Sequence, residues 1–184
     1  WMLGMAAQWM NLSGQCANAV APLLISTEQG RCKSTFCSTL MPEELQRFYT
    51  DKFDITSVSG CEQKLSYFGL VNLDEFDRYG TRAMATLKNL MQLKKLNFRK
   101  SHRSYYSQLP RVASFIGTSN QKELLTDTTG SRRFLCVEVL EKIDCTKPDH
   151  GQLYAQLKAE LLSGERYWFT TEEERAISLL PCFT

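Results

Sequence analysis

The chain has 184 residues, and its 22 Lys and Arg residues nearly balance 20 Asp and Glu residues to give a net charge of +2. This length suits a single compact domain over residues 1–184, which can bury a hydrophobic core without staples. The seven cysteines form no C-x-x-C pair and there are only two histidines, which argues against a disulfide framework or a zinc site and predicts reduced thiols.

The N-terminal stretch predicts a helix followed by a buried strand. Apolar residues recur at helical spacing near the start of the chain, at Met2, Met5, Ala6 and Trp9. We expect residues 1–10 to form an amphipathic helix on the core. This stretch is too short for a membrane span and has no basic start, which favours a cytoplasmic protein without a membrane segment. Because the chain opens on Trp1 inside this helix, we interpret it as a fragment of a longer protein.

A loop suited to the phosphates of a nucleotide follows the first predicted strand, at residues 19–25. A polar turn with Gly30 leads into residues 33–35 (Lys-Ser-Thr), which open a predicted helix. In such a strand, turn and helix, backbone N–H groups face the phosphates, the lysine binds the terminal phosphates and the serine hydroxyl binds Mg²⁺. The two glycines of the pattern G-x-x-x-x-G-K-[ST] fall on Ser26 and Cys32, so an ordinary turn without a ligand is the alternative.

Helices and irregular chain connect this loop to a second strand. The helix from Lys33 is expected to end near Met41, because Pro42 disfavours helical geometry in the preceding residue. Pro42 suits the first turn of a second short helix. We then expect residues 48–56 to be extended or irregular and residues 59–66 to be helical.

Two adjacent acids form the second chemical signal. Residues 67–73 predict a buried strand, and Asp74 and Glu75 follow it directly. Adjacent residues of a strand point in opposite directions, so we expect different roles for the two acids. Asp74 is predicted to hold Mg²⁺, and Glu75 to orient or deprotonate an attacking water. In a parallel sheet both acids would lie at the same edge as the Lys33 loop, whereas a plain turn after a strand is the alternative.

Positive charge is concentrated in the middle third of the chain. The basic residues are Arg78, Arg82, Lys88, Lys94, Lys95, Arg99, Lys100, His102, Arg103 and Arg111. Residues 81–95 predict an ordinary packed helix, and residues 96–106 place basic residues between aromatic ones. Cations for phosphates and rings for bases suit single-stranded DNA, so we expect a protruding hairpin or loop that binds it. A merely solvated loop is the alternative.

Polar residues also flank the last two predicted strands. Residues 111–120 predict a third buried strand with Asn120 at its tip, where the side chain could contact a γ-phosphate or a water. Residues 135–139 predict a fourth strand, and Arg132 and Arg133 lie just before it. Two arginines are costly to bury without an anion, so a γ-phosphate is the partner that this pair suggests, and simple exposure is the alternative.

Two further helices are predicted, over residues 149–162 and 171–180. Gly164 suits the end of the first helix. Thr171, with Glu174 three residues later, predicts a capping box at the start of the second. No catalytic chemistry is evident in either helix.

Four motifs occur in this order: Lys33-Ser34, residues 70–77 (Leu-Val-Asn-Leu-Asp-Glu-Phe-Asp), residues 114–120 (Ser-Phe-Ile-Gly-Thr-Ser-Asn) and residues 129–134 (Thr-Gly-Ser-Arg-Arg-Phe). With them the chain resembles the virulence-associated protein E family over residues 1–180. That family looks like the ATPase half of primase–helicases from phages and mobile elements, related to superfamily three helicases within the AAA+ group. The resemblance implies an α/β fold, a three-layer P-loop NTPase with a central, mostly parallel sheet flanked by helices.

The resemblance also implies ATP and Mg²⁺ as cofactors. Lys33 would bind the β- and γ-phosphates, Ser34 and Asp74 would bind Mg²⁺, Glu75 would act on the water, and Asn120 would be the sensor beside it. The residues implied to contact the nucleotide are Gln29, Gly30, Arg31, Cys32, Lys33, Ser34 and Thr35.

The implied assembly is a homo-oligomeric ring, with a hexamer favoured and ATP at the subunit boundaries. Arg132 or Arg133 would be an arginine finger that reaches the ATP of a neighbouring subunit. The residues implied to grip single-stranded DNA in the ring channel are Arg99, Lys100, His102 and Arg103.

Two functions remain open at this level. The first is an ATP-driven DNA helicase or translocase that acts on single-stranded DNA or a replication fork, with a primase domain in the same full-length chain. The second is an ATP-binding scaffold or replication-initiation module with little turnover, which the missing glycines at Ser26 and Cys32 favour. The motor is favoured by the presence of Asp74, Glu75, Asn120 and the pair Arg132 and Arg133, because a scaffold has no chemical need for them.

Overall fold

The computed structural model of the chain describes residues 1–179 apart from residues 13, 15, 56, 100–105 and 123–130. The helices are α1 (Met2–Trp9), α2 (Lys33–Thr39), α3 (Val58–Tyr67), α4 (Thr81–Gln92), α5 (His150–Leu162) and α6 (Thr171–Leu179), with the 3₁₀ helices η1 (Glu43–Phe48), η2 (Phe76–Arg78) and η3 (Ser131–Arg133). The strands are β1 (Ala21–Ile25), β2 (Tyr49–Thr50), β3 (Leu70–Leu73), β4 (Lys95–Arg99), β5 (Tyr106–Pro110), β6 (Ser114–Ser119) and β7 (Phe134–Glu138). The helices and strands predicted from the sequence occur in the predicted order.

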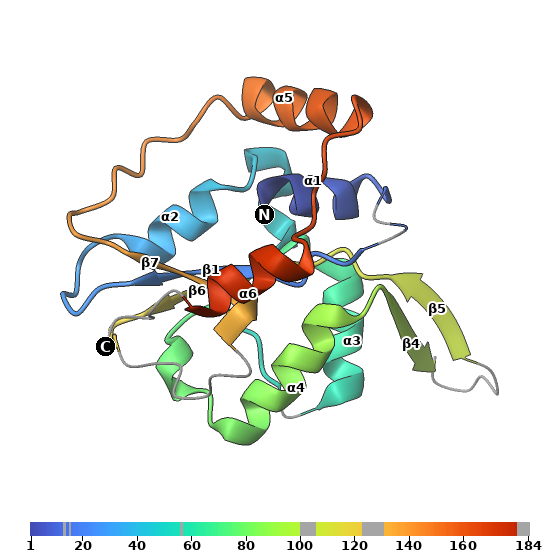
Figure 1. The fold of residues 1–184 in the computed structure, drawn as a ribbon, viewed down its shortest axis with the longest axis horizontal. Helices are drawn as coiled ribbons and strands as arrows, with labels where there is room; N and C mark the ends of the chain where they lie inside the picture. The colour runs from blue at the N-terminus through green and yellow to red at the C-terminus, as the bar shows by residue number, and fades with distance from the viewer. Residues whose placement is uncertain (13, 15, 56, 100–105, 123–130, 180–184) are drawn as a thin grey trace.

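A central sheet has the strand order β2-β3-β6-β1-β7, and every neighbouring pair in it is parallel. Helices α3 and α4 pack on one face and α1 and α2 on the other, with α5 against α1 (Figure 1). The prediction of a three-layer α/β fold is therefore confirmed. Strand β6 lies between β1 and β3, and Gly117 is opposite both Leu23 and Leu73. A Cβ on Gly117 would lie 2.9 Å from Leu23 Cδ1, which explains a glycine in the middle of the sheet.

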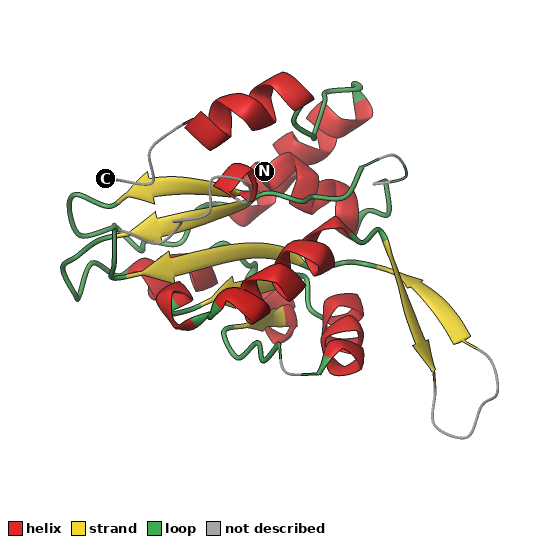
Figure 2. Ribbon diagram, turned by 60° about the horizontal axis from the view of Figure 1, so that its bottom comes forward, coloured by secondary structure: helices red, strands yellow, loops and turns green. Residues whose placement is uncertain are grey.

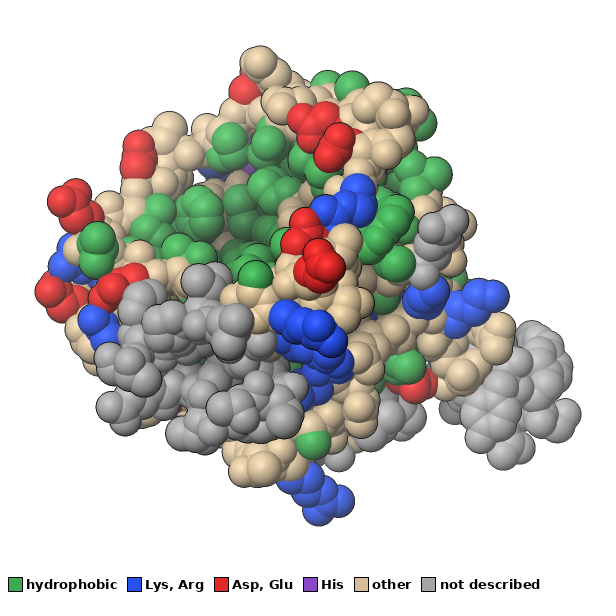
Figure 3. Space-filling model, viewed as in Figure 1, with side chains coloured by type: hydrophobic (Ala, Val, Ile, Leu, Met, Phe, Trp, Pro, Cys, Tyr) green, Lys and Arg blue, Asp and Glu red, His purple; other side chains and the backbone are tan. Residues whose placement is uncertain are grey.

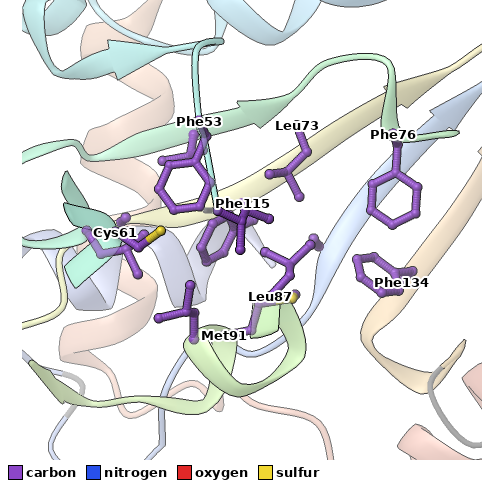
Figure 4. Packing of buried hydrophobic residues seen from close by; sticks show 14 of the residues in the cluster. Phe53, Cys61, Leu73, Phe76, Leu87, Met91, Phe115 and Phe134 are labelled. Carbon is purple, nitrogen blue, oxygen red and sulfur yellow. The ribbon is translucent and has the colours of Figure 1, made fainter. Parts of the chain in front are cut away.

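The two faces of the sheet bury separate hydrophobic cores. On the α3 and α4 face, Phe115 of the sheet packs with Leu87 and Met91 of α4, as Figure 4 shows. On the other face, Leu24 packs with Met5 of α1. Because successive strand residues point to opposite faces, a strand covered on both sides is apolar throughout, as the run in β1 is.

Strands β4 and β5 form an antiparallel hairpin that projects from the body, at the end of the molecule opposite to the carboxyl ends of the sheet strands (Figure 2). Arg111 follows β5 and is only 2% exposed. Its guanidinium donates hydrogen bonds of 2.7–3.1 Å to the carbonyl oxygens of Asn18, Met91, Leu93 and Ala113. Burial lowers the pKa of Arg111 to about 9. Arg111 therefore fixes the base of the hairpin and does not belong to the basic surface that the sequence suggested.

The capping box of α6 lies one residue earlier than predicted. The Glu173 N–H donates to Thr170 Oγ1 at 3.2 Å, and the Thr170 N–H donates to the Glu173 carboxylate at 2.7 Å. The prediction of Thr171 with Glu174 is wrong, because α6 packs against η3 and Glu174 instead forms a 3.6 Å ion pair with Arg132.

The cysteines depart from the prediction at one described position. Free thiols are found at Cys16, Cys32, Cys37, Cys61 and Cys145. Cys136 on β7 is disulfide-bonded, so the prediction that the cysteines are reduced is wrong there. Spacing along the chain does not reveal which sulfur atoms the fold brings together.

The surface carries apolar as well as charged areas. Figure 3 shows hydrophobic side chains gathered in a hollow below α5, with charged side chains around it. Val137 of β7 and Leu140 are 45% and 72% exposed. Within the part of the chain that the structure describes, no helix has the length and apolar character to cross a membrane.

Candidate functional site

Polar residues from three segments line a hollow of about 240 Å³ at the carboxyl ends of β1, β3 and β6. Parallel strands end at the same edge of a sheet, which is where open α/β sheets bind ligands. The lining residues are Gln29, Gly30, Arg31, Cys32, Lys33, Ser34, Thr35, Asp74, Glu75, Thr118, Ser119 and Asn120. Larger hollows of about 680 and 590 Å³ lie beside α4 and between α1 and α5, but the loop before α2 does not line them.

The loop between β1 and α2 accommodates its two missing glycines differently. Ser26 donates its N–H to the Ser119 carbonyl oxygen at 3.2 Å, and its hydroxyl accepts the Glu28 N–H at 3.2 Å. Gly30 and Cys32 both have left-handed backbones, with φ of 78° and 61°. This conformation costs a residue with a Cβ about 1–2 kcal/mol. The strain of the loop is therefore at Cys32, whereas Ser26 fits by forming hydrogen bonds.

Lys33, the first residue of α2, points its ammonium into the buried side of the hollow. The side chain is buried, and Nζ donates to Asn120 Oδ1 at 2.9 Å and to the Ser26 carbonyl oxygen at 3.3 Å. Burial lowers the pKa of Lys33, and this effect outweighs the opposing effect of the Asp74 carboxylate. A buried cation with two neutral acceptors favours an anionic ligand, which would supply the charge that these acceptors lack.

Asp74, the residue after β3, joins α2 to the end of β6. Its Oδ1 accepts a hydrogen bond of 2.7 Å from Ser34 Oγ and a second one from Thr118 Oγ1. A carboxylate beside a hydroxyl fits Mg²⁺, which takes few protein ligands and completes its shell with phosphate and water oxygens. Among the described residues, no group of three or more His, Cys, Asp and Glu side chains is arranged around a metal.

Glu75 also lines the hollow, but not for the reason that the sequence suggested. The chain leaves the strand at Asp74, and Glu75 has a left-handed backbone with φ of 50° and ψ of 51°. The expectation that the two acids point to opposite faces of a strand is therefore wrong at Glu75. Its carboxylate forms an ion pair with Arg78, one turn later in η2. Strained backbones at residues with a Cβ cluster at functional sites.

The end of β6 supplies hydroxyl groups whose roles the sequence analysis did not identify. Thr118 is buried and holds Asp74, and Ser119 Oγ donates to Asp77 Oδ1 at 3.0 Å. A signal was present, because two polar residues in a row follow Phe115, Ile116 and Gly117 at the end of the strand. Together with Asn120, they connect the end of β6 to both the lysine and the acids of the hollow.

Other predicted site residues lie away from this hollow. Arg132 and Arg133 directly precede Phe134, and Phe134 pairs with Ala21, the first residue of β1. The two arginines therefore lie at the amino ends of the strands, whereas the hollow lies at the carboxyl ends. Arg132 forms its ion pair with Glu174, and partial burial lowers the pKa of Arg133. Of the predicted DNA-binding residues, Arg99 ends β4, and Lys100, His102 and Arg103 lie outside the described residues.

The sequence matches the family model described as the virulence-associated protein E-like domain over residues 1–180. The chain belongs to this family. No curated protein matches the chain. Among solved structures, the domain is similar to the apo A form of the NrS-1 C-terminal region, with 17% identity and a TM-score of 0.50 over 95% of this chain and 37% of that one.

A second apo structure of the NrS-1 C-terminal region has 19% identity and a TM-score of 0.49 over 95% of this chain and 38% of that one. The domain thus spans less than two fifths of the length of these structures. At such identities the likeness to the first structure concerns the fold alone.

Proposed function

We propose that this domain binds ATP with Mg²⁺ in the hollow before α2 and hydrolyses it to move a replication protein of phage or mobile-element type along DNA. The observation that carries the proposal is the convergence of Lys33 with Asn120, and of Ser34 with Asp74, at one edge of the sheet. A lysine, a hydroxyl and a carboxylate in this arrangement match the requirements of a triphosphate and its metal.

The loop residues would bind the phosphates. Residues 29–35 line the hollow, and their backbone N–H groups would face the phosphates. Lys33 would exchange its contacts with Ser26 and Asn120 for phosphate oxygens. This exchange replaces two neutral acceptors by charged ones, which form stronger hydrogen bonds with an ammonium. Asn120, released by the lysine, would then be available to the γ-phosphate or the attacking water.

Ser34 and Asp74 would hold Mg²⁺, and Thr118 would keep the Asp74 carboxylate oriented. When bound, the ion neutralises charge that develops on the phosphate oxygens. Glu75 would accept the proton of the attacking water. For that step the ion pair with Arg78 has to open, because a carboxylate held by a guanidinium is a weaker base.

The proposed DNA-binding element lies at the other end of the molecule from the hollow. The hairpin of β4 and β5 would grip single-stranded DNA in the channel of a ring, with a hexamer favoured. Arg132 and Arg133 lie at the opposite sheet edge from the hollow of their own chain, so they would act on ATP of a neighbouring subunit. A cytoplasmic protein with a primase domain in the same full-length chain is the setting that the family resemblance implies.

A scaffold that binds ATP with little turnover is the second candidate. Two observations favour it: the left-handed backbone at Cys32 and the ion pair that engages Glu75. The first would hinder close approach of the backbone to the phosphates, and the second makes Glu75 a weaker base. The first candidate is preferred, because the carboxylates and Asn120 are all present in the hollow.

ATP hydrolysis measured with and without single-stranded DNA tests the proposal. Hydrolysis stimulated by DNA is expected for a motor, and tight binding without turnover would favour the scaffold. Lys33→Ala should abolish hydrolysis and weaken binding of a non-hydrolysable ATP analogue, because the phosphates lose their cation. Lys158→Ala, which removes an exposed lysine of α5, is the matched control. Normal turnover by a folded Lys33→Ala variant would remove the loop from the mechanism.

A further inference from the structure

Two free thiols meet at the loop before α2. Cys145 Sγ lies 3.6 Å from the Cys32 carbonyl oxygen, although the residues are 113 positions apart. The Cys145 side chain therefore lies directly beside Cys32. Both residues are half-buried, so small oxidants can reach them.

The segment that carries Cys145 is held beside the loop by the backbone. After β7, the Val139 N–H donates to the Ile25 carbonyl oxygen at 2.8 Å, and the Ile143 N–H donates to the Arg31 carbonyl oxygen at 3.1 Å. Cys145 therefore meets Cys32 as a consequence of the fold. Cys32 is among the residues that line the hollow, and Cys145 is not.

We propose that Cys32 and Cys145 form a reversible disulfide that displaces the loop before α2 and thereby weakens nucleotide binding. With hydrogen peroxide as oxidant, one thiolate attacks a peroxide oxygen, which gives a sulfenic acid and hydroxide, and the hydroxide takes up the proton that the thiol had released and becomes water. The second thiol attacks the sulfenic sulfur, which forms the S–S bond and releases a second water. Both sulfur atoms are oxidised and both peroxide oxygens are reduced. A dithiol reverses the reaction by thiol–disulfide exchange.

The bond would displace the loop. A disulfide requires an S–S distance of about 2 Å, closer than the 3.6 Å contact that Cys145 Sγ makes with the Cys32 backbone, so the bond would draw Cys32 toward Cys145. Lys33 and Ser34 follow Cys32 directly and would move with it. Displacements on the order of 1 Å are enough to disturb a phosphoryl-transfer site. The oxidised protein should therefore bind ATP about tenfold more weakly or worse. This effect rests on the proposed function, whereas formation of the bond does not.

The experiment treats the whole chain with hydrogen peroxide and, in parallel, with glutathione disulfide. Peptide mapping by mass spectrometry without reductant identifies a peptide that links Cys32 to Cys145, and it distinguishes this bond from that of Cys136. We expect the linked peptide in the wild type and in Cys16→Ser, a matched removal of another half-buried thiol. Cys145→Ser should not form it. Absence of the linked peptide in the wild type would overturn the proposal.

Binding of a fluorescent ATP analogue is then compared before and after oxidation. Loss of binding in the wild type, recovery with dithiothreitol and no loss in Cys145→Ser support control of the loop. Equal affinity of the oxidised and reduced wild type, with the bond present, would overturn it. If the reduced protein binds no nucleotide, the proposed function fails. The proposed control is then judged by melting temperature: a disulfide that holds the loop should raise it by roughly 5–10 °C, and an unchanged value would overturn the proposal.

Discussion

Ser34 Oγ donates a hydrogen bond of 2.7 Å to Asp74 Oδ1, which joins the first turn of α2 to the end of β3 across 40 positions of the chain. Strand β6 lies between β1 and β3 and supplies Thr118 to the same carboxylate oxygen. The contact thus depends on the strand order and does not follow from either segment alone. Among the described hydrogen bonds, Asp74 is the one carboxylate lining the hollow that contacts a residue of α2.

The first prediction separates the two acids. Asp74→Asn should weaken Mg²⁺-dependent binding of ATP, because the neutral amide is a poor Mg²⁺ ligand. Glu75→Gln should leave binding nearly intact and lower turnover on the order of 10²-fold or more, the scale of a positioned general base. Binding measured with and without Mg²⁺, together with single-turnover hydrolysis, checks both expectations.

Asp51→Asn is a matched control, because Asp51 is an exposed acid in the chain after β2. It should change neither quantity. If Asp74→Asn impaired hydrolysis alone and Glu75→Gln impaired metal binding, the two roles would be reversed.

The second prediction concerns the strained residue of the loop. Cys32 has φ of 61°, and glycine there removes the clash of the Cβ while increasing the entropy of the unfolded chain. The net stabilisation by Cys32→Gly should be about 0.5–1 kcal/mol, which raises the melting temperature by roughly 1–3 °C. ATP binding should also tighten, because the backbone can approach the phosphates.

Cys32→Ala is the control for this prediction, since it removes the thiol and keeps the Cβ. It should retain the strain and bind ATP no more tightly than the wild type. Urea unfolding of the three proteins measures the difference. Equal stabilisation by Cys32→Ala and Cys32→Gly would show that the thiol, and not the left-handed backbone, destabilises the wild-type loop.

The sequence was sufficient to predict four strands of the sheet, because each contains an apolar run with polar residues beside it, whereas the two-residue strand β2 was expected only as extended or irregular chain. Asp74 after β3 and Asn120 after β6 are examples, and parallel strands bring such ends to one edge. Thr118 was overlooked because a hydroxyl in a strand has many roles, and its contact with Asp74 appears only once β6 lies beside β3.

Other features of the structure depend on contacts between residues far apart in the chain, which no local sequence pattern reveals. Arg111 reads as one more cation of a basic stretch, and only the fold reveals the four carbonyl oxygens that surround its guanidinium. The approach of Cys145 to Cys32 depends in the same way on the path of the chain after β7. Sequence periodicity determines which face of an element is buried, but not which distant residue lies against it.

The third prediction is a pH dependence near the start of α6. Hydrogen bonds from Arg166 and from the Thr170 N–H lower the pKa of Glu173 from 4.5 to about 2. A carboxyl whose pKa is lower in the folded state stabilises the fold above its unfolded pKa and loses this effect as the pH falls through the folded value. The contribution should therefore be complete above pH 4.5 and disappear between pH 4.5 and 2.

Arg166→Ala tests this expectation through its melting temperature relative to the wild type. The difference should be present at neutral pH and shrink as the pH falls from 4.5 toward 2. Arg82→Ala, which removes an exposed arginine of α4, is the matched comparison. A difference between Arg166→Ala and wild type that stays constant over this range would assign the effect of Arg166 to packing.

The last prediction tests whether the domain works as a ring. Arg132 and Arg133 lie at the opposite sheet edge from the hollow of their own chain, so a catalytic role requires a neighbouring subunit. Arg133→Ala should lower kcat by roughly 10³-fold or more and leave ATP affinity nearly unchanged, and Arg132→Ala is the second choice. Because finger and base would come from different subunits, inactive Arg133→Ala mixed with inactive Glu75→Gln should recover partial activity. Failure to complement in mixed oligomers that demonstrably form would make Arg133 a structural residue.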